Sequence, residues 1–145
     1  MIEATYVVAG VPHLVIVTRD AHGMSRKDLL SLAPRLRAHP DLGPEGANVD
    51  FITVKGRHDL DIRCYERGVE GETFSSGSGC IASALAAHLS GQADSPVACL
   101  SRAGLVSTVT LEPGPEGSFS AVLSGDARVI YNALLNAEAI SGFAP

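Results

Sequence analysis

The chain has 145 residues, of which 46% are hydrophobic, and a formal net charge of −5 at pH 7. This length suits one domain that buries a core, and an acidic chain without basic clusters is not typical of nucleic-acid-binding proteins. No apolar run approaches the roughly 20 residues that span a membrane, and the start lacks a signal-peptide pattern. We therefore expect a cytoplasmic protein without a membrane partner.

The N-terminal part predicts two strands followed by a helix. Residues 4–9 and 13–18 are rich in Val, Ile and Tyr, which favour strands, and the Gly-Val-Pro segment between them predicts a turn. Ser25 is expected to cap a helix that begins at about Arg26 and carries a stripe of leucines. Pro34 is expected either to interrupt this helix or to mark a second short turn.

The middle of the chain predicts a surface loop at residues 40–46, then a hairpin, then a helix. The hairpin strands are residues 49–54 and 60–65, which alternate apolar and polar side chains around a short connection. Residues 80–89 are rich in alanine and leucine, and their large apolar residues recur every four positions. Because this segment has no charged face, it predicts a buried helix, which Gly91 ends.

The C-terminal part predicts four short strands separated by regular turns, at residues 97–101, 105–111, 118–123 and 127–130. Short strands around one apolar helix suggest a curved or closed sheet that wraps the helix. The pattern alone predicts the α+β class. We place a single domain at residues 1–131 and a tail at 132–145, which is either a short helix or disordered.

A serine- and glycine-rich stretch, residues 75–79, leads directly into the predicted buried helix. The first backbone N–H groups of a helix have no internal partner, and the helix dipole is positive there. Such a turn can bind a carboxylate or a phosphate, and Arg67 could add a bidentate clamp. The alternative is a flexible loop that only caps the helix. The pattern is neither a Walker loop nor a dinucleotide fingerprint.

Three groups of motifs follow one another in an order that matches a known family. They are Gly-Val-Pro-His at 10–13, Gly-Ala-Asn-Val-Asp-Phe at 46–51, and the run of Glu-Arg-Gly at 66–68, Gly-Glu-Thr at 71–73 and Ser-Gly-Ser-Gly at 76–79. Together they resemble the C-terminal half of diaminopimelate epimerase, within the cofactor-independent epimerases, racemases and isomerases. The resemblance implies a barrel-like, antiparallel-rich sheet around a central helix, with no cofactor and no metal.

The resemblance also assigns site residues. Two cysteines act as acid and base in this family, and Ser76 replaces one of them here. A serine hydroxyl is too weakly acidic to substitute unless a neighbouring base activates it. His13 and Glu66 match active-site residues of the family, so His13, Glu66 and Ser76 are the catalytic candidates. The candidate substrate-binding residues are Asn48, Arg67, Ser76, Gly77, Ser78 and Gly79.

Two further features separate this chain from the family pattern. Glu70 looks inserted between Val69 and Gly71, and the sequence supplies only one of the two halves that make up the family's chain. The three cysteines lack the Cys-x-x-Cys spacing of a zinc site and do not suggest a disulfide framework. Core packing is the expected role of Cys64 and Cys99, and Cys80 is either another core residue or a substitute nucleophile or base.

The function expected from these residues is that of an isomerase or epimerase, or of a derived cyclase-type enzyme. It would act on a small molecule with a carboxylate or other acidic group, by proton transfer without the two-cysteine mechanism. Two alternatives remain: a non-catalytic module that binds an anionic metabolite, and a subunit that completes a separately encoded first half. Because a half-fold leaves its cleft face open, we also expect a homodimer.

Overall fold

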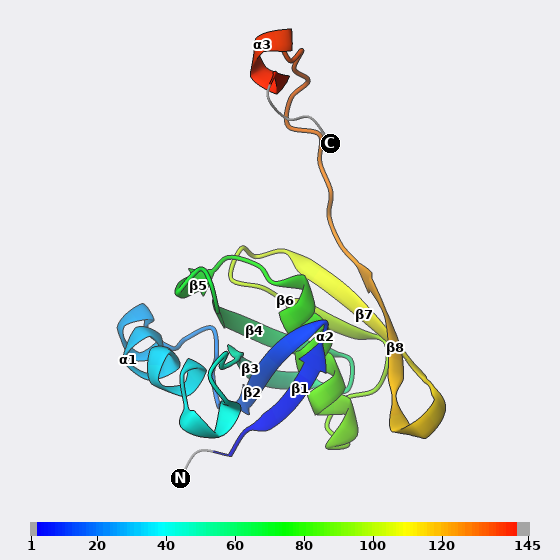
Figure 1. Ribbon diagram of the computed structural model, residues 1–145. Coiled ribbons are helices and arrows are strands. Elements are labelled where there is room, and N and C mark those ends of the chain that lie inside the picture. Colours follow the sequence, from blue (N-terminus) through cyan, green and yellow to red (C-terminus); the bar gives the residue numbers. More distant parts are fainter. Residues whose placement is uncertain (1–2, 142–145) are drawn as a thin grey trace.

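The computed structural model describes residues 3–141 as a mixed sheet that curls around one helix (Figure 1). The strands are β1 (Thr5–Ala9), β2 (Val11–Val17), β3 (Asn48–Gly56), β4 (Asp59–Glu66), β5 (Gly71–Thr73), β6 (Val97–Leu100), β7 (Val106–Pro113) and β8 (Phe119–Ser124). The helices are α1 (Arg26–Arg37), α2 (Gly77–Leu89) and α3 (Ala137–Ile140), with 3-10 turns at Pro40–Leu42 and Pro115–Gly117. The predicted α+β class is confirmed.

The sheet runs in the order β1-β2-β3-β4-β6-β7-β8, and β5 pairs with β4 away from this path. The β2–β3 and β4–β6 pairs are parallel, whereas the other five pairs are antiparallel. Parallel neighbours need a long crossover, and α1 and α2 lie in these two crossovers. The expected antiparallel-rich sheet around a central helix is therefore confirmed.

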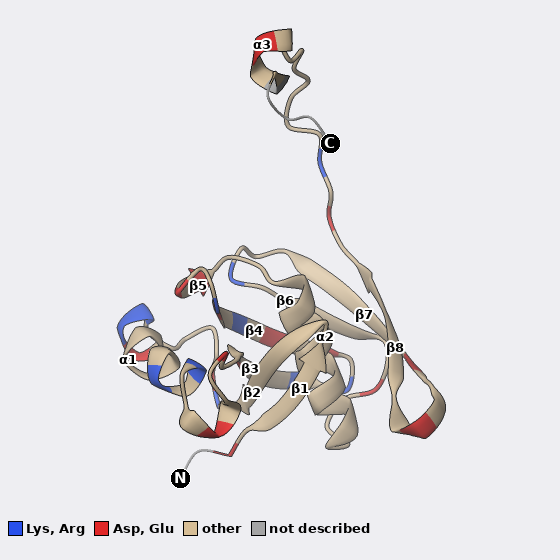
Figure 2. Ribbon diagram, in the orientation of Figure 1, with Lys and Arg blue, Asp and Glu red and all other residues tan. Residues whose placement is uncertain are grey.

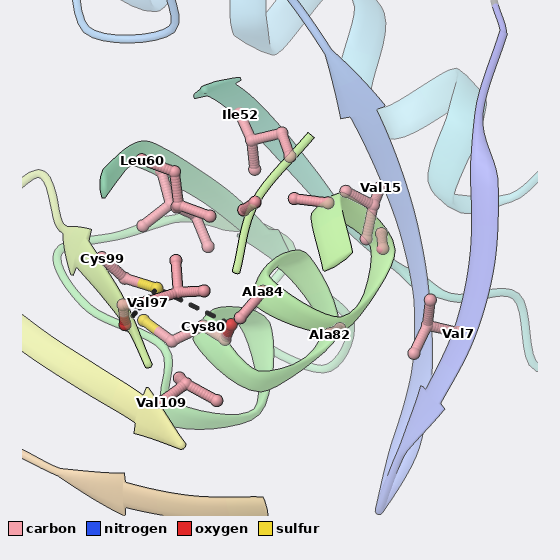
Figure 3. Packing of buried hydrophobic residues seen from close by; sticks show 14 of the residues in the cluster. Val7, Val15, Ile52, Leu60, Cys80, Ala82, Ala84, Val97, Cys99 and Val109 are labelled. Carbon is pink, nitrogen blue, oxygen red and sulfur yellow. Dashed lines mark hydrogen bonds between the residues drawn. The ribbon is translucent and has the colours of Figure 1, made fainter. Parts of the chain in front are cut away.

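Helix α2 lies inside the curl of the sheet and packs against strands from β1 to β8. Its buried face is built mainly from alanines, which pack among Val, Leu, Ile and Cys side chains of the strands (Figure 3). Small side chains let the sheet approach the helix closely on several sides. Figure 2 shows no charged residue along α2, in agreement with the burial expected from its sequence.

Helix α1 covers the opposite face of β3 and β4. Phe51 and Val49 point toward α1, whereas Ile52 packs in the cluster around α2, as the two-residue period of a strand requires. The expected cap is confirmed, because Ser25 Oγ accepts the Asp28 N–H at 3.1 Å. The expected interruption at Pro34 is wrong: α1 continues through Pro34 to Arg37.

Tertiary packing explains why α1 tolerates its proline. Proline removes one backbone donor and introduces a local clash, which favours a break. Leu29 and Ala33, both fully buried, anchor this helix on the sheet and outweigh that preference. None of the helices within residues 3–141 has the length and apolar character needed to cross a membrane.

The chain after β8 differs from the expectation. The strand expected at residues 127–130 is absent, because this segment pairs with no other strand and leaves the sheet as an extended arm (Figure 1). The arm ends in α3, so the expected tail does contain a short helix. Residues 142–145 of that tail lie outside the described residues. The domain boundary at residue 131 stays a prediction.

Candidate functional site

Strand register gathers most of the candidate residues at one end of the sheet. His13 on β2 is the pairing partner of Asn48 at the start of β3. The start of β3 in turn lies beside the end of β4, where Glu66 is located, because these two strands are antiparallel. The structure therefore brings His13 on β2 together with Asn48 and Glu66, which lie at the two open ends of the β3–β4 hairpin.

His13 forms a buried pair with Asp50, a residue that the sequence reasoning missed. Its Nδ1 lies 2.6 Å from Asp50 Oδ2, and neither side chain is exposed to solvent. The other ring nitrogen, Nε2, lies 3.4 Å from the amide nitrogen of Asn48. Both nitrogens of the ring thus face protein groups. This geometry suits a residue that holds Asn48 and Asp50 in position.

Asn48 connects this pair to the turn that follows β4. Its Oδ1 accepts the backbone N–H of Arg67 at 2.8 Å, which fixes the start of the turn. The Arg67 guanidinium points to the surface, where Nη1 lies 3.2 Å from Glu45 Oε2. Glu45 is largely exposed, so this ion pair stabilises little and can exchange for another anion.

Glu70 has a local structural role in the same turn. It adopts a left-handed backbone conformation with φ 52°, and its carboxylate accepts the Gly68 N–H at 3.2 Å and pairs with Arg37 at 2.7 Å. The Gly68 hydrogen bond and the Arg37 charge lower the pKa of Glu70. Glu66, by contrast, is half-buried, and its Oε1 accepts the Thr73 hydroxyl at 3.0 Å.

The serine- and glycine-rich stretch forms the start of α2. The expected helix start at Cys80 is too late, because the helix begins at Gly77 with Ser76 as its N-cap. Ser76 Oγ accepts the Gly79 N–H at 3.2 Å, and the Ser76 carbonyl accepts the Cys80 N–H at 3.0 Å. The N–H groups of Gly77 and Ser78 have no intrahelical acceptor, so they remain available as donors at this terminus.

Gly79 lies where the start of α2 meets the sheet. A Cβ atom at this position would lie 2.8 Å from Cys64 Sγ, 2.9 Å from Asp50 Oδ1 and 3.0 Å from Ser76 Oγ. These separations are shorter than real Cβ contacts. Glycine is therefore required here by the close approach of three buried side chains, and it links Ser76 to the His13–Asp50 pair.

All three thiols are free and buried, which confirms core packing for Cys64 and Cys99. Burial raises the pKa of Cys64, and the nearby Asp50 carboxylate raises it further. The Cys99 thiol lies 3.8 Å from the Cys80 carbonyl oxygen (Figure 3). A hydrogen bond with Cys80 and burial raise the pKa of Cys99. Cys80 is 1% exposed and faces the core around α2.

The arrangement provides hydrogen-bond donors suited to an anion, but it does not activate Ser76 as a nucleophile. Within residues 3–141, the Ser76 side chain hydrogen-bonds only with the Gly79 N–H, so no base contacts its hydroxyl. The same residues contain no group of His, Cys, Asp and Glu side chains that could hold a metal ion. The chemistry available at this end of the sheet is anion binding at α2 and a half-buried carboxylate at Glu66.

Comparisons with known proteins agree with the motifs. The model of the diaminopimelate epimerase family matches residues 5–130. A diaminopimelate epimerase from Gemmatimonas aurantiaca is 36% identical over 133 residues, covering 87% of this chain and 47% of that protein. One from Methanocella arvoryzae is 38% identical over 134 residues, covering 91% and 46%. The chain thus spans about half the length of the curated relatives it matches.

A solved structure supports the fold. The phenazine biosynthesis protein of the PhzF family from Bacillus anthracis aligns with a TM-score of 0.54 and 15% sequence identity. The alignment covers 81% of this chain and 37% of that protein. At this identity the likeness concerns the fold alone.

Proposed function

Because the chain belongs to the diaminopimelate epimerase family, we propose that it supplies one half of a cofactor-independent isomerase site. The ligand is a small molecule with a carboxylate, and diaminopimelate, named in its relatives, is the first candidate. The N-terminus of α2 binds the carboxylate, while Asn48 and Arg67 orient the molecule. One C–H bond breaks and one forms at the same carbon, so no co-reactant is needed.

The observation that carries this proposal is the position of the α2 N-terminus relative to the strand ends. Gly79 packs against Asp50, which holds His13, and His13 lies beside Asn48. The unpaired donors of Gly77 and Ser78 therefore belong to the same end of the fold as Asn48 and Arg67. A helix N-terminus attracts anions through these donors and its dipole.

Proton transfer at a carbon needs a base on one face and an acid on the other. In this proposal Glu66 handles one proton, since its half-buried carboxylate lies at the end of β4 beside Asn48. His13 is fully buried, so we assign it to the support of Asn48 in place of the proton transfer expected from the family resemblance. Ser76 provides the cap that holds the anion-binding turn.

In this proposal the second proton-handling group lies in the other half of the family's fold, outside the 145 residues of this sequence. The chain covers 46–47% of its two relatives from Gemmatimonas and Methanocella, which leaves room for an additional half of similar size. A second copy of this chain is the simplest source, and a separately encoded first half is the alternative. Either one would cover the open face beside the α2 N-terminus.

A non-catalytic binding module is the second candidate function. It is favoured by one specific observation: the hydroxyl of Ser76, where the family has a thiol, contacts no base within the described residues. Such a module would keep the donors of α2 and Arg67 for a carboxylate ligand and perform no proton transfer.

Deuterium exchange distinguishes the two candidates. The purified protein is incubated with diaminopimelate in deuterated water, and the α-proton signal is followed by proton NMR. Loss of that signal, abolished by Glu66→Gln, supports the isomerase. Saturable binding without any exchange supports the binding module. Exchange that appears only in a complex with a co-purified partner chain supports the separately encoded half.

A further inference from the structure

A pocket of about 260 Å³ lies on the face of the sheet opposite to α2. Its lining residues are His22, Arg63, Phe74 and Arg102, which we call the arginine pocket. Arg63 pairs in register with Phe51, and Phe51 packs in the cluster beneath α1. The pocket is therefore separate from the core around α2. Two guanidinium groups line it, and the proposed isomerase site uses neither of them.

Arg63 is almost completely buried, and one of its nitrogens is unsatisfied. Its Nε donates to Glu72 Oε1 at 2.6 Å, and both side chains are only 2% exposed. Its Nη1 donates to the carbonyl oxygens of Ala21, at 3.3 Å, and Met24. Within residues 3–141, Nη2 has no hydrogen-bond partner, and neither has the second carboxylate oxygen of Glu72, Oε2. A buried charged donor without an acceptor is costly, so this nitrogen calls for a partner that protein atoms do not supply.

Arg102 adds a second positive charge at the same place. Its Nη1 lies 3.2 Å from Glu72 Oε1, the same oxygen that accepts from Arg63. One carboxylate thus serves two guanidinium groups, and the pocket keeps an excess positive charge. Arg102 is 36% exposed, so its remaining donors are accessible from solvent. The adjoining loop is fixed, because the Ala103 N–H donates to the Phe74 carbonyl at 3.0 Å.

We propose that the arginine pocket binds a small oxyanion, either a carboxylate or a phosphate. Its oxygens accept hydrogen bonds from Arg63 Nη2 and from Arg102, and the exposed Phe74 ring borders the rest of the molecule. Guanidinium groups suit this role because their planar donors match two oxygens of one anion. The proposal is independent of the isomerase function, since the pocket and the α2 N-terminus share no donor.

Titration by NMR tests the pocket directly. The isotope-labelled protein is titrated with sodium phosphate, and separately with sodium succinate, at constant ionic strength set with chloride. We expect saturable shifts at the Nε–H signals of Arg63 and Arg102 and at the amide of Phe74. Tighter binding of phosphate or of succinate identifies which oxyanion the pocket prefers.

Two variants and one control make the result specific. Arg102→Ala should weaken binding about tenfold or more, because it removes a charge-assisted hydrogen bond. Arg102→Lys keeps the positive charge but loses the planar guanidinium group, so it should weaken binding less than Arg102→Ala does. This variant remains informative if the alanine variant does not fold. Arg128→Ala is the matched control, because it removes an exposed arginine that is also paired with a carboxylate, Asp126, at 2.6 Å.

The proposal is overturned by any of three results. The first is a set of shifts confined to the amides of residues 77–79. The second is an affinity for the oxyanion in Arg102→Ala or Arg102→Lys that equals that of the wild type. The third is a response that does not saturate. The first of these results would leave an anion site at α2 intact, so failure of the arginine pocket is distinguishable from failure of the proposed isomerase site.

Discussion

His13 Nδ1 lies 2.6 Å from Asp50 Oδ2 in a pair that is completely shielded from solvent. Removing one member of a buried pair leaves the other uncompensated, which costs about 3–5 kcal/mol. We therefore expect Asp50→Ala to lower the free energy of unfolding by an amount of this order, measured by urea denaturation. Asp59→Asn, an exposed change on β4, should stay within about 0.5 kcal/mol of the wild type. Equal stability of the two variants would contradict the importance of the pair.

Gly79→Ala should destabilise the protein although alanine favours helices. The added Cβ would lie 2.8–3.0 Å from side-chain atoms of Cys64, Asp50 and Ser76, all three of which are buried. Overpacking of this kind typically costs about 1–3 kcal/mol, which exceeds the helix-propensity gain of about 1 kcal/mol. Gly71→Ala is the control, because its Cβ would find nothing closer than 3.9 Å. A higher melting temperature for Gly79→Ala than for the wild type would contradict a steric conflict at this position.

The buried thiols should resist alkylation in the folded protein. All three cysteines are buried, so the reagent has little access to them, and burial also raises the pKa of the Cys64 thiol. We expect iodoacetamide to label none of them at pH 8 until the protein is unfolded, with activity or ligand binding unchanged. Stoichiometric labelling of Cys80 with parallel loss of activity would instead support a thiol mechanism.

Stability should also fall in alkaline solution. Burial raises the pKa of Cys64 in the folded state, so above the ordinary thiol pKa the unfolded chain loses a proton that the folded chain keeps. The contribution of Cys64 is therefore complete below about pH 8.5 and decreases as the pH rises further, by up to about 1.4 kcal/mol per pH unit. Urea denaturation between pH 8 and pH 10 measures this slope, and Cys64→Ala should reduce it. An unchanged slope in that variant would contradict the assignment.

Arg67→Ala should weaken binding of a carboxylate ligand about tenfold or more. Among the described residues, the guanidinium contacts only the exposed Glu45, so it can turn to a ligand and form a charge-assisted hydrogen bond. Calorimetry with diaminopimelate measures the change. Arg35→Ala, on the last turn of α1, serves as the charge-matched control. The same affinity in both variants would remove Arg67 from the binding site.

The protein should form a homodimer in solution. The segment after β8 exposes five large apolar side chains, those of Val129, Ile130, Tyr131, Leu134 and Leu135. Exposed apolar surface often marks an interface. We expect light scattering at micromolar concentration to give twice the chain mass, and deletion of residues 126–145 to weaken the dimer. Deletion of residues 1–3, at the other end, is the control. A monomer that is active without a partner would refute this prediction.

Most strands and both long helices could be predicted because composition and period reflect burial. Segments rich in Val and Ile predicted the strands, and the uncharged alanine-rich segment predicted the helix inside the sheet. The segment 127–130 also has strand composition, yet it has no neighbouring strand, and pairing is a property of the fold rather than of the segment. Strand β5 is only three residues long, so it is too short for a periodic signal.

The site was only partly predictable for a related reason. His13 and Asn48 could be named from motifs, whereas their contact depends on the register between β2 and β3. Asp50 was missed because β3 is buried on both faces, so alternation does not reveal which of its residues meets α2. The Val-Asp-Phe sequence contained the available signal, since an acidic residue inside a buried strand needs a partner.

At position 76, helix capping and acid–base reactivity favour different side chains. An oxygen there accepts the Gly79 N–H and fixes the first turn of α2, whereas a sulfur is a weak acceptor and would leave that turn looser. A sulfur, however, ionises far more readily than a hydroxyl. A serine in place of a cysteine at this position therefore caps the helix more firmly, but it no longer supplies a side chain that readily transfers a proton. In the proposed site, proton transfer then depends on other groups, such as the Glu66 carboxylate, while the first turn of α2 is held more rigidly.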